Sequence, residues 1–327
     1  MTALLFVGAL ALIALASELF TNAVEWAGHL LHLGTGATGS LLAALGTALP
    51  ETMVVVAALL GGASSSSQIA IGAVLGSSFL LLTLGAAVTG VALLSRSGSR
   101  HLRVEPAQVR RDLSVFLSAF GCAVASTLLL RPERVVIGVL LLLLYAGYAR
   151  ASLSAGRPDG ASPEPLHFVR WRAGTPPAAV VAAQLLAGTI LLAIGSGLFV
   201  NALHSAATGL GLNPLILAVI AVPFATELPE TLNSVLWIRS RDDGLAIGNI
   251  AGAAAFQACV LGFVGISFTN WQLGTAGLLS AGCAFATGLY LLGVLRGGRA
   301  HGGWLLAAAL PWLAYVTAEL VTGGRLG

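Results

Sequence analysis

Two glutamates, Glu51 and Glu230, each follow a proline inside a long apolar stretch of this sequence. An ionised carboxylate within a membrane span costs several kcal/mol, roughly 2.5–3.5 on insertion scales, so it is rarely present without a function. The proline lacks an N–H group, so the carbonyl four residues earlier, on Gly46 or Ala225, loses its usual helix partner. A freed carbonyl inside a membrane needs another partner, and a bound cation supplies one. The pattern therefore predicts a cation site that is built from oxygen ligands.

The two glutamates belong to an internal duplication. The sequence ALGTALPETMVVVA at 44–57 returns as PFATELPETLNSVL at 223–236, with six identities at an offset of 179 residues. The identities include Thr47 and Thr226, whose hydroxyls add two more oxygen donors. Ca²⁺ takes six to eight such ligands, and Na⁺ accepts similar donors. The alternative is a pair of proline kinks whose carboxylates bond to neighbouring helices, and the repetition at equivalent positions argues against it.

The composition is that of an integral membrane protein. Apolar residues make up 57% of the chain and charged residues 9%, with a mean hydropathy of +0.92. Runs of about 18 or more apolar residues can cross the hydrocarbon core of a bilayer as helices. We therefore expect an all-α integral membrane fold of ten transmembrane helices. They are predicted at about 3–29, 37–60, 68–95, 112–130, 134–150, 177–206, 212–238, 244–267, 273–295 and 303–322.

The arginines predict the orientation of these spans. All sixteen basic residues are arginine, and ten spans place thirteen of them on one side of the membrane and three on the other. The positive-inside rule makes the side with thirteen cytoplasmic, so both termini are expected outside a cell (inner) membrane. No positive charge precedes the first apolar run, which predicts that this span is retained. The net charge of +3 reflects this topology, and no nucleic-acid partner is expected.

A polar segment divides the chain into two halves. Residues 151–176 are rich in Pro, Gly, Ser and Arg and are expected to form a cytoplasmic linker. Five spans precede it in a first repeat, residues 1–150, and five follow it in a second repeat, residues 177–327. An odd number of spans per repeat inverts the second repeat relative to the first. In such folds the binding site lies near the membrane midplane, where the repeats meet.

The duplicated motif resembles the G-T-S-L-P-E signature of the calcium/cation antiporters, whose best-known branch is the sodium/calcium exchangers. Each half of those proteins carries the signature in its second span and a G-N-x-x-G-S-N-like motif in its third. The resemblance implies that Glu51 and Glu230 are the central metal-binding carboxylates. It also implies that Thr47 and Thr226 ligate through hydroxyl or carbonyl oxygens. The first and sixth spans would then move against a core of the second, third, seventh and eighth.

Several positions depart from the family pattern. The signature serine is Ala48 in the first copy and Glu227 in the second. The family's third-span motif ends in a polar residue, and that position is occupied by Leu81 in the first half and by Gln257 in the second. The serine of this motif is retained as Ser77 in the first half only. Several oxygen donors that the family uses for sodium are therefore missing, so its usual sodium stoichiometry does not carry over. Glu227, Ser77 and Gln257 remain candidate metal ligands.

Other carboxylates suggest coupling to protons. Glu227 lies three residues before Glu230, so the two share a helix face. Like charges this close in a poorly solvated site favour binding of a proton by one of them. Our hypothesis is that Glu227 replaces a sodium site with a proton site; alternatively, it faces a water-filled vestibule or bonds a backbone donor. Glu18 and Glu25 share a face of the first span and are candidates for a vestibule lining or proton relay, although Glu25 also suits a partly solvated helix end.

These features predict a secondary active antiporter that exchanges Ca²⁺, or another divalent cation, for H⁺ and/or Na⁺ by alternating access. A monovalent Na⁺/H⁺ exchanger in the same fold is the main alternative, and a channel is another. Enzymatic activity is not expected, because the histidines are scattered and the Asp242-Asp243 pair stands alone, where we expect it to cap the next helix. The expected partners are inorganic cations and the lipid bilayer, with no cofactor besides the transported ions.

Overall fold

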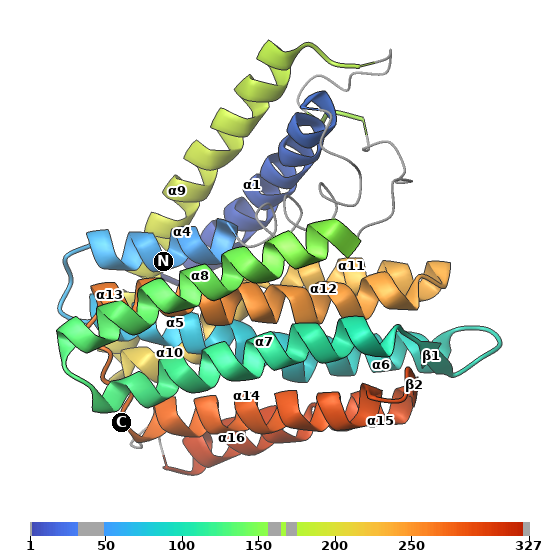
Figure 1. Cartoon of the computed structure of the whole chain (residues 1–327). Coiled ribbons are helices and arrows are strands. Elements are labelled where there is room, and N and C mark those ends of the chain that lie inside the picture. Colours follow the sequence, from blue (N-terminus) through green and yellow to red (C-terminus); the bar gives the residue numbers. More distant parts are fainter. Residues whose placement is uncertain (1, 32–48, 156–164, 168–174, 323–327) are drawn as a thin grey trace.

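The computed structural model describes residues 2–31, 49–155, 165–167 and 175–322, and nearly all of them are helical (Figure 1). Within these described ranges, eight helical segments are long and apolar enough to cross a membrane, and a bent pair of helices makes a ninth if it counts as one span. The shorter apolar helix Leu49–Leu60 is the described part of the expected second span, 37–60. The all-α membrane architecture is thus confirmed.

The elements follow the expected spans closely. The first part of the chain forms α1 (Thr2–Leu30), α4 (Leu49–Leu60), α5 (Ser66–Leu80), the π-helical η2 (Leu81–Gly85), α6 (Ala86–Ser95), β1 (His101–Arg103), α7 (Pro106–Ala125), the 3₁₀ turn η3 (Ser126–Leu128) and α8 (Arg131–Ala155). The second part forms α9 (Ala178–Leu210), α10 (Pro214–Thr226), α11 (Leu228–Ser240), α12 (Asp243–Phe256), the π-helical η4 (Gln257–Leu261), α13 (Gly262–Phe268), α14 (Gly274–Leu295), β2 (Arg299–His301), α15 (Gly302–Ala307) and α16 (Leu310–Thr322). The fifth span was expected to end at 150, but α8 continues to Ala155, so the break between the halves is shorter than predicted.

The third span of each half contains a π-helical segment at the same place. The segments η2 and η4 begin 176 residues apart, at Leu81 and Gln257. The same offset relates Gly72 to Gly248 in the sequence. Such π-helical insertions are rare and frequently occur at functional sites. The resemblance between the two copies therefore extends to the local backbone conformation.

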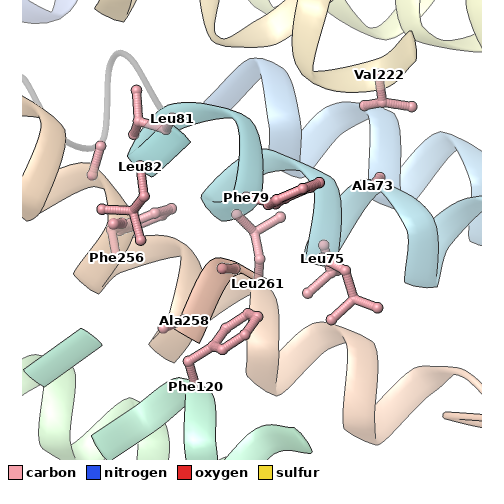
Figure 2. Close-up of a cluster of buried hydrophobic side chains, with 14 of the residues drawn as sticks. Ala73, Leu75, Phe79, Leu81, Leu82, Phe120, Val222, Phe256, Ala258 and Leu261 are labelled. Carbon is pink, nitrogen blue, oxygen red and sulfur yellow. The ribbon is translucent and has the colours of Figure 1, made fainter. Parts of the chain in front are cut away.

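The helices of the central bundle approach one another closely where small residues lie. A Cβ atom on Gly72 would be 2.5 Å from the carbonyl oxygen of Leu215, and one on Gly76 would be 2.5 Å from that of Val219. Glycine is therefore required for α5 to cross α10 at this distance, as small residues allow between membrane helices. Figure 2 shows apolar side chains, among them Phe79, filling the space between this pair and the neighbouring helices.

Helices α1 and α9 form a pair that projects from the rest of the bundle (Figure 1). Gln184 on α9 donates from Nε2 to Asn22 Oδ1 and to the Leu19 carbonyl, each at 2.9 Å. A Cβ on Gly188 would lie 3.0 Å from the Phe20 backbone. The first and sixth spans are thus joined to each other by a buried polar contact and close packing.

A two-stranded sheet lies at the end of the bundle where the arginine-rich loops gather. Strands β1 and β2 pair antiparallel, with Leu102 opposite Ala300. The expectation of helices alone did not include this sheet. Nearby, Arg96 Nη1 lies 2.5 Å from Asp243 Oδ1, and both side chains are largely buried. The sheet and this ion pair connect the loops of the two halves.

Candidate functional site

The seventh span is broken at Glu227. Helices α10 and α11 meet there at an angle of 48°, with Pro223 inside α10 and Pro229 in the first turn of α11. The N–H of Glu227 donates to the Pro223 carbonyl at 2.8 Å, and the Glu227 carbonyl accepts from Thr231 N at 3.0 Å. Glu230 lies in the first turn of α11, where the positive end of the helix dipole favours negative charge. The prolines therefore break the span, so that a new helix begins beside the carboxylates of Glu227 and Glu230.

Three carboxylates meet at this break. One oxygen each of Glu51, Glu227 and Glu230 lies within 4.8 Å of the other two, and the residues are at most 1% exposed. Among the described residues this is the only group of three or more His, Cys, Asp or Glu side chains so arranged. Neither carboxylate oxygen of Glu51 has a hydrogen-bond donor in the described part of the chain. At 4.8 Å and an effective dielectric constant of 20, each pair of charges repels by about 3.5 kcal/mol. The cluster therefore needs either a bound cation or bound protons to offset this repulsion.

Gln257 fixes the carboxylate at the helix break. Its Nε2 lies 3.0 Å from each carboxylate oxygen of Glu227, and its Oε1 accepts from Ser78 Oγ at 3.1 Å. All three side chains are buried. Because Ser78 occupies the amide oxygen, the amide nitrogen points toward Glu227. The first π-helical residue of the eighth span therefore positions the carboxylate of the seventh.

The other predicted ligands lie at different distances from this cluster. Thr226 Oγ1 is 3.4 Å from Glu227 Oε1 and also donates to the Val222 carbonyl at 3.3 Å. Ser77 is fully buried beside Glu227, and Ala225 is buried in the last turn of α10. Thr47 and Gly46 lie outside the described residues.

The structure does not bring the two acidic residues of the first span to the site. Glu18 is exposed, and its Oε1 lies 3.2 Å from His167 Nε2 in the segment between the halves. Glu25 is half-buried in a later turn of α1. Neither belongs to the carboxylate cluster. A direct role of either residue in that cluster is not supported by their positions.

Two residues that were not among the predicted ligands support the site. Ser78 orients Gln257 by donating to its amide oxygen. Asn249 Nδ2 donates to the Glu230 carbonyl at 3.0 Å and lies 3.2 Å from Ser234 Oγ, so it fixes the start of α11. The signal for Asn249 was its match to the asparagine of the family's third-span motif.

The expected helix cap at the Asp242-Asp243 pair is wrong. Asp242 occupies the N-cap position of α12 but makes no side-chain capping bond there. Asp243 instead pairs with Arg96 and accepts from the backbone N–H of Arg103 at 2.8 Å. A buried arginine offers a stronger partner than the exposed helix end, and only the tertiary fold places that arginine nearby.

Comparison with known proteins shows the family. The sequence profile of the sodium/calcium exchanger proteins matches residues 1–153 and 180–321. The chain belongs to the sodium/calcium exchanger family. Members of this family and the matching solved structures are ion exchangers and not enzymes.

Two relatives share about a quarter of their aligned residues with this exchanger-family chain. The inner membrane protein YrbG of Escherichia coli (strain K12) is 27% identical over 229 residues, which are 68% of this chain and 66% of that protein. The match thus spans slightly less than two thirds of the length of YrbG. The putative antiporter CaxA of Alkalimonas amylolytica is 26% identical over 249 residues, 72% of this chain and 70% of that protein. The chain is thus a multi-pass membrane protein, and one of its relatives is named as an inner membrane protein.

Solved structures of exchangers share the fold. The H⁺/Ca²⁺ exchanger CAX superimposes with a TM-score of 0.78 at 16% identity, over 98% of this chain and 82% of that one. Native YfkE gives 0.73 at 19% identity, over 98% and 93%. The sodium–calcium exchanger NCX_Mj gives 0.62 at 19% identity, over 97% and 98%. At these identities the similarity establishes the fold of the exchanger-family chain. It does not establish which ions the chain transports.

Proposed function

We propose that this member of the family is a secondary active antiporter that exchanges Ca²⁺ for H⁺ at Glu51, Glu227 and Glu230. The observation that carries the proposal is the meeting of these three buried carboxylates within 4.8 Å at a broken membrane helix. Carboxylate oxygens are hard ligands that Ca²⁺ prefers, and a buried cluster of this kind in a membrane span marks an ion pathway.

The charges of the cluster favour competition between a divalent cation and a proton. Bound Ca²⁺ offsets most of the charge of the three ionised carboxylates, and it therefore displaces the proton that the empty site holds. When Ca²⁺ leaves, protons can reduce the repulsion among the carboxylates that remain. Glu227 is the proposed proton site, because it replaces the serine of the family signature and adds a third carboxylate to the pair formed by Glu51 and Glu230.

The remaining ligands come from the same elements. We assign the hydroxyl oxygens of Thr226 and Ser77, beside Glu227, as further ligands of the cation. The carbonyl oxygen of Ala225, at the end of α10, is another proposed ligand. Thr47 and Gly46 are their proposed counterparts in the first half. Gln257 acts by positioning Glu227.

The proposed architecture is ten spans in two inverted repeats, residues 1–150 and 177–327, with the second span completed by residues before Leu49. Two observations support the duplication: the π-helical segments recur at an offset of 176 residues, and carboxylates from both halves share one site. Alternating access would then move the α1–α9 pair against the central bundle. The arginine distribution supports both termini outside the cell.

Transport in liposomes tests the proposal. The purified protein is reconstituted, and Ca²⁺ uptake is measured under an outward H⁺ gradient and, separately, under an outward Na⁺ gradient. We expect uptake with the proton gradient and its loss in the Glu51→Gln variant. Glu319→Gln is the matched control, since Glu319 is a buried carboxylate on α16 outside the cluster. Uptake driven by Na⁺ alone would refute proton coupling, and no Ca²⁺ movement with either gradient would refute the calcium assignment in favour of monovalent Na⁺/H⁺ exchange.

A further inference from the structure

The two-stranded sheet carries four nitrogen-bearing side chains on one face. Its register places His101 opposite His301 and Arg103 opposite Arg299 (strands β1 and β2 in Figure 1). These residues are at alternate positions of each strand, so all four side chains lie on the same side of the sheet. The residue between them in each strand is buried. The face of the sheet that points away from the core is therefore basic.

This arrangement is unfavourable for the protein alone. Like charges directly opposite each other on neighbouring strands destabilise the pairing. Across the described ranges of the chain, neither Arg103 nor Arg299 forms an ion pair with an acidic residue. The rings of His101 and His301 are packed edge to face, with centroids 5.0 Å apart. A bound anion would offset the repulsion between the two arginines.

A cavity of about 380 Å³ adjoins this face. It is lined by His101, Tyr290, Gly293, Val294, Arg299, Ala300, His301 and Trp304. His301 Nδ1 accepts the N–H of Gly303 at 3.1 Å, so in the neutral ring the proton is on Nε2, which remains a donor. A guanidinium and two imidazoles therefore line a cavity whose other wall, on α14, is apolar.

The surface beside the cavity suits lipid chains. Trp304, in α15 at the start of the last span, is 59% exposed. Leu306 on α15 and Leu289 on α14 are also exposed. Tryptophan is enriched at the level of the lipid headgroups, and basic pockets between membrane helices bind anionic headgroups. The basic side of the cavity thus meets an apolar surface at the end of the bundle that the arginines predict to be cytoplasmic.

We propose that this cavity binds the phosphate headgroup of an anionic phospholipid, with Arg299 and the two histidines lining it and Arg103 adding its charge from the strand position opposite Arg299. The acyl chains would lie against the exposed apolar side chains of α14 and α15. A free phosphate ion would use the same basic groups but would gain nothing from the apolar wall. The bound lipid would hold the loops of the two halves together at the sheet.

Lipid binding is measured on the delipidated protein in neutral detergent, by native mass spectrometry and thermal unfolding. Phosphatidylglycerol is titrated beside phosphatidylcholine and inorganic phosphate. The Arg103→Gln/Arg299→Gln variant removes the paired charges, and Gly293→Leu fills the cavity, because a Cβ at Gly293 meets no atom within 4 Å. Arg100→Gln is the matched control, since Arg100 is an exposed arginine in the same loop that does not line the cavity.

We expect the wild type to bind phosphatidylglycerol in preference to phosphatidylcholine. An arginine beside the bound headgroup contributes about 1 kcal/mol, which is roughly fivefold, so the double variant should lose about thirtyfold in affinity. Gly293→Leu should lose binding without any change of charge, and Arg100→Gln should retain it. An equal loss in Arg100→Gln, no lipid preference in the wild type, or equally strong binding of inorganic phosphate would each overturn the proposal. The readout does not depend on which ions the protein transports.

Discussion

Replacing Glu227 with glutamine should uncouple Ca²⁺ binding from proton release. The change keeps the size of the side chain and one accepting oxygen for Gln257, but it removes one of three charges at the helix break. In the wild type, Gln257 Nε2 is 3.0 Å from each Glu227 oxygen, so the carboxylate is held in place beside Glu51 and Glu230. The variant therefore tests the charge of Glu227 with little change in the packing around it.

The expected magnitude follows from the spacing of the carboxylates. Each ionised pair within 4.8 Å repels by about 3.5 kcal/mol at an effective dielectric constant of 20, so Glu227 accounts for about 7 kcal/mol of repulsion in the empty site. One pH unit corresponds to about 1.4 kcal/mol, so the wild-type site should hold at least one proton when no cation is bound. Ca²⁺ binding then releases this proton, and the apparent affinity should rise about tenfold per pH unit.

Calorimetry counts the protons directly. Ca²⁺ is titrated into the detergent-solubilised protein between pH 6 and pH 8, in two buffers with different ionisation enthalpies. Glu227→Gln should release about one proton fewer per Ca²⁺ than the wild type, and its affinity should depend less on pH. Glu319→Gln should match the wild type, since it neutralises a buried carboxylate elsewhere. If Glu227→Gln releases as many protons as the wild type, Glu227 is not the residue that couples proton release to Ca²⁺ binding.

Three further variants test the structure around the site. Gln257→Leu leaves the buried carboxylate of Glu227 without its amide donor, so the protein should lose about 1.5–3 kcal/mol of stability in thermal unfolding. Saturating Ca²⁺ should restore most of this stability. An unchanged melting temperature would contradict the positioning role of Gln257. Asp243→Asn should destabilise the protein by about 3–5 kcal/mol, because it leaves Arg96 buried without its charge partner, and the double variant with Arg96→Gln should be less than additive. Gly76→Ala should prevent folding or lower the melting temperature sharply, because its Cβ would be 2.5 Å from a backbone oxygen of α10. Gly282→Ala should be tolerated, because a Cβ there meets no atom within 4 Å. Equal yields and melting temperatures of the two variants would show that the helix crossing can relax.

Much of the fold could be read from the sequence, because membrane spans are a local property. About twenty apolar residues must form a helix in a bilayer wherever they occur, so most spans were predicted to within a few residues. The family followed from two copies of one motif. The helix break at Glu227 was also foreseeable, since Pro223 and Pro229 each remove a helical hydrogen bond. The continuation of α8 to Ala155 was not, because its last residues lack the apolar character that marks a span.

The sequence by itself determined that Glu51 and Glu230 hold equivalent positions in two copies of one motif, and that Glu227 lies three residues before the second of them. Only the tertiary structure decided that Glu51 reaches both of these carboxylates, that Gln257 holds Glu227, and that the paired strands bring Arg103 opposite Arg299. The physical reason is the distance along the chain. Spacing along one helix follows from its 3.6-residue period, whereas contacts between helices depend on how every side chain and glycine between them packs.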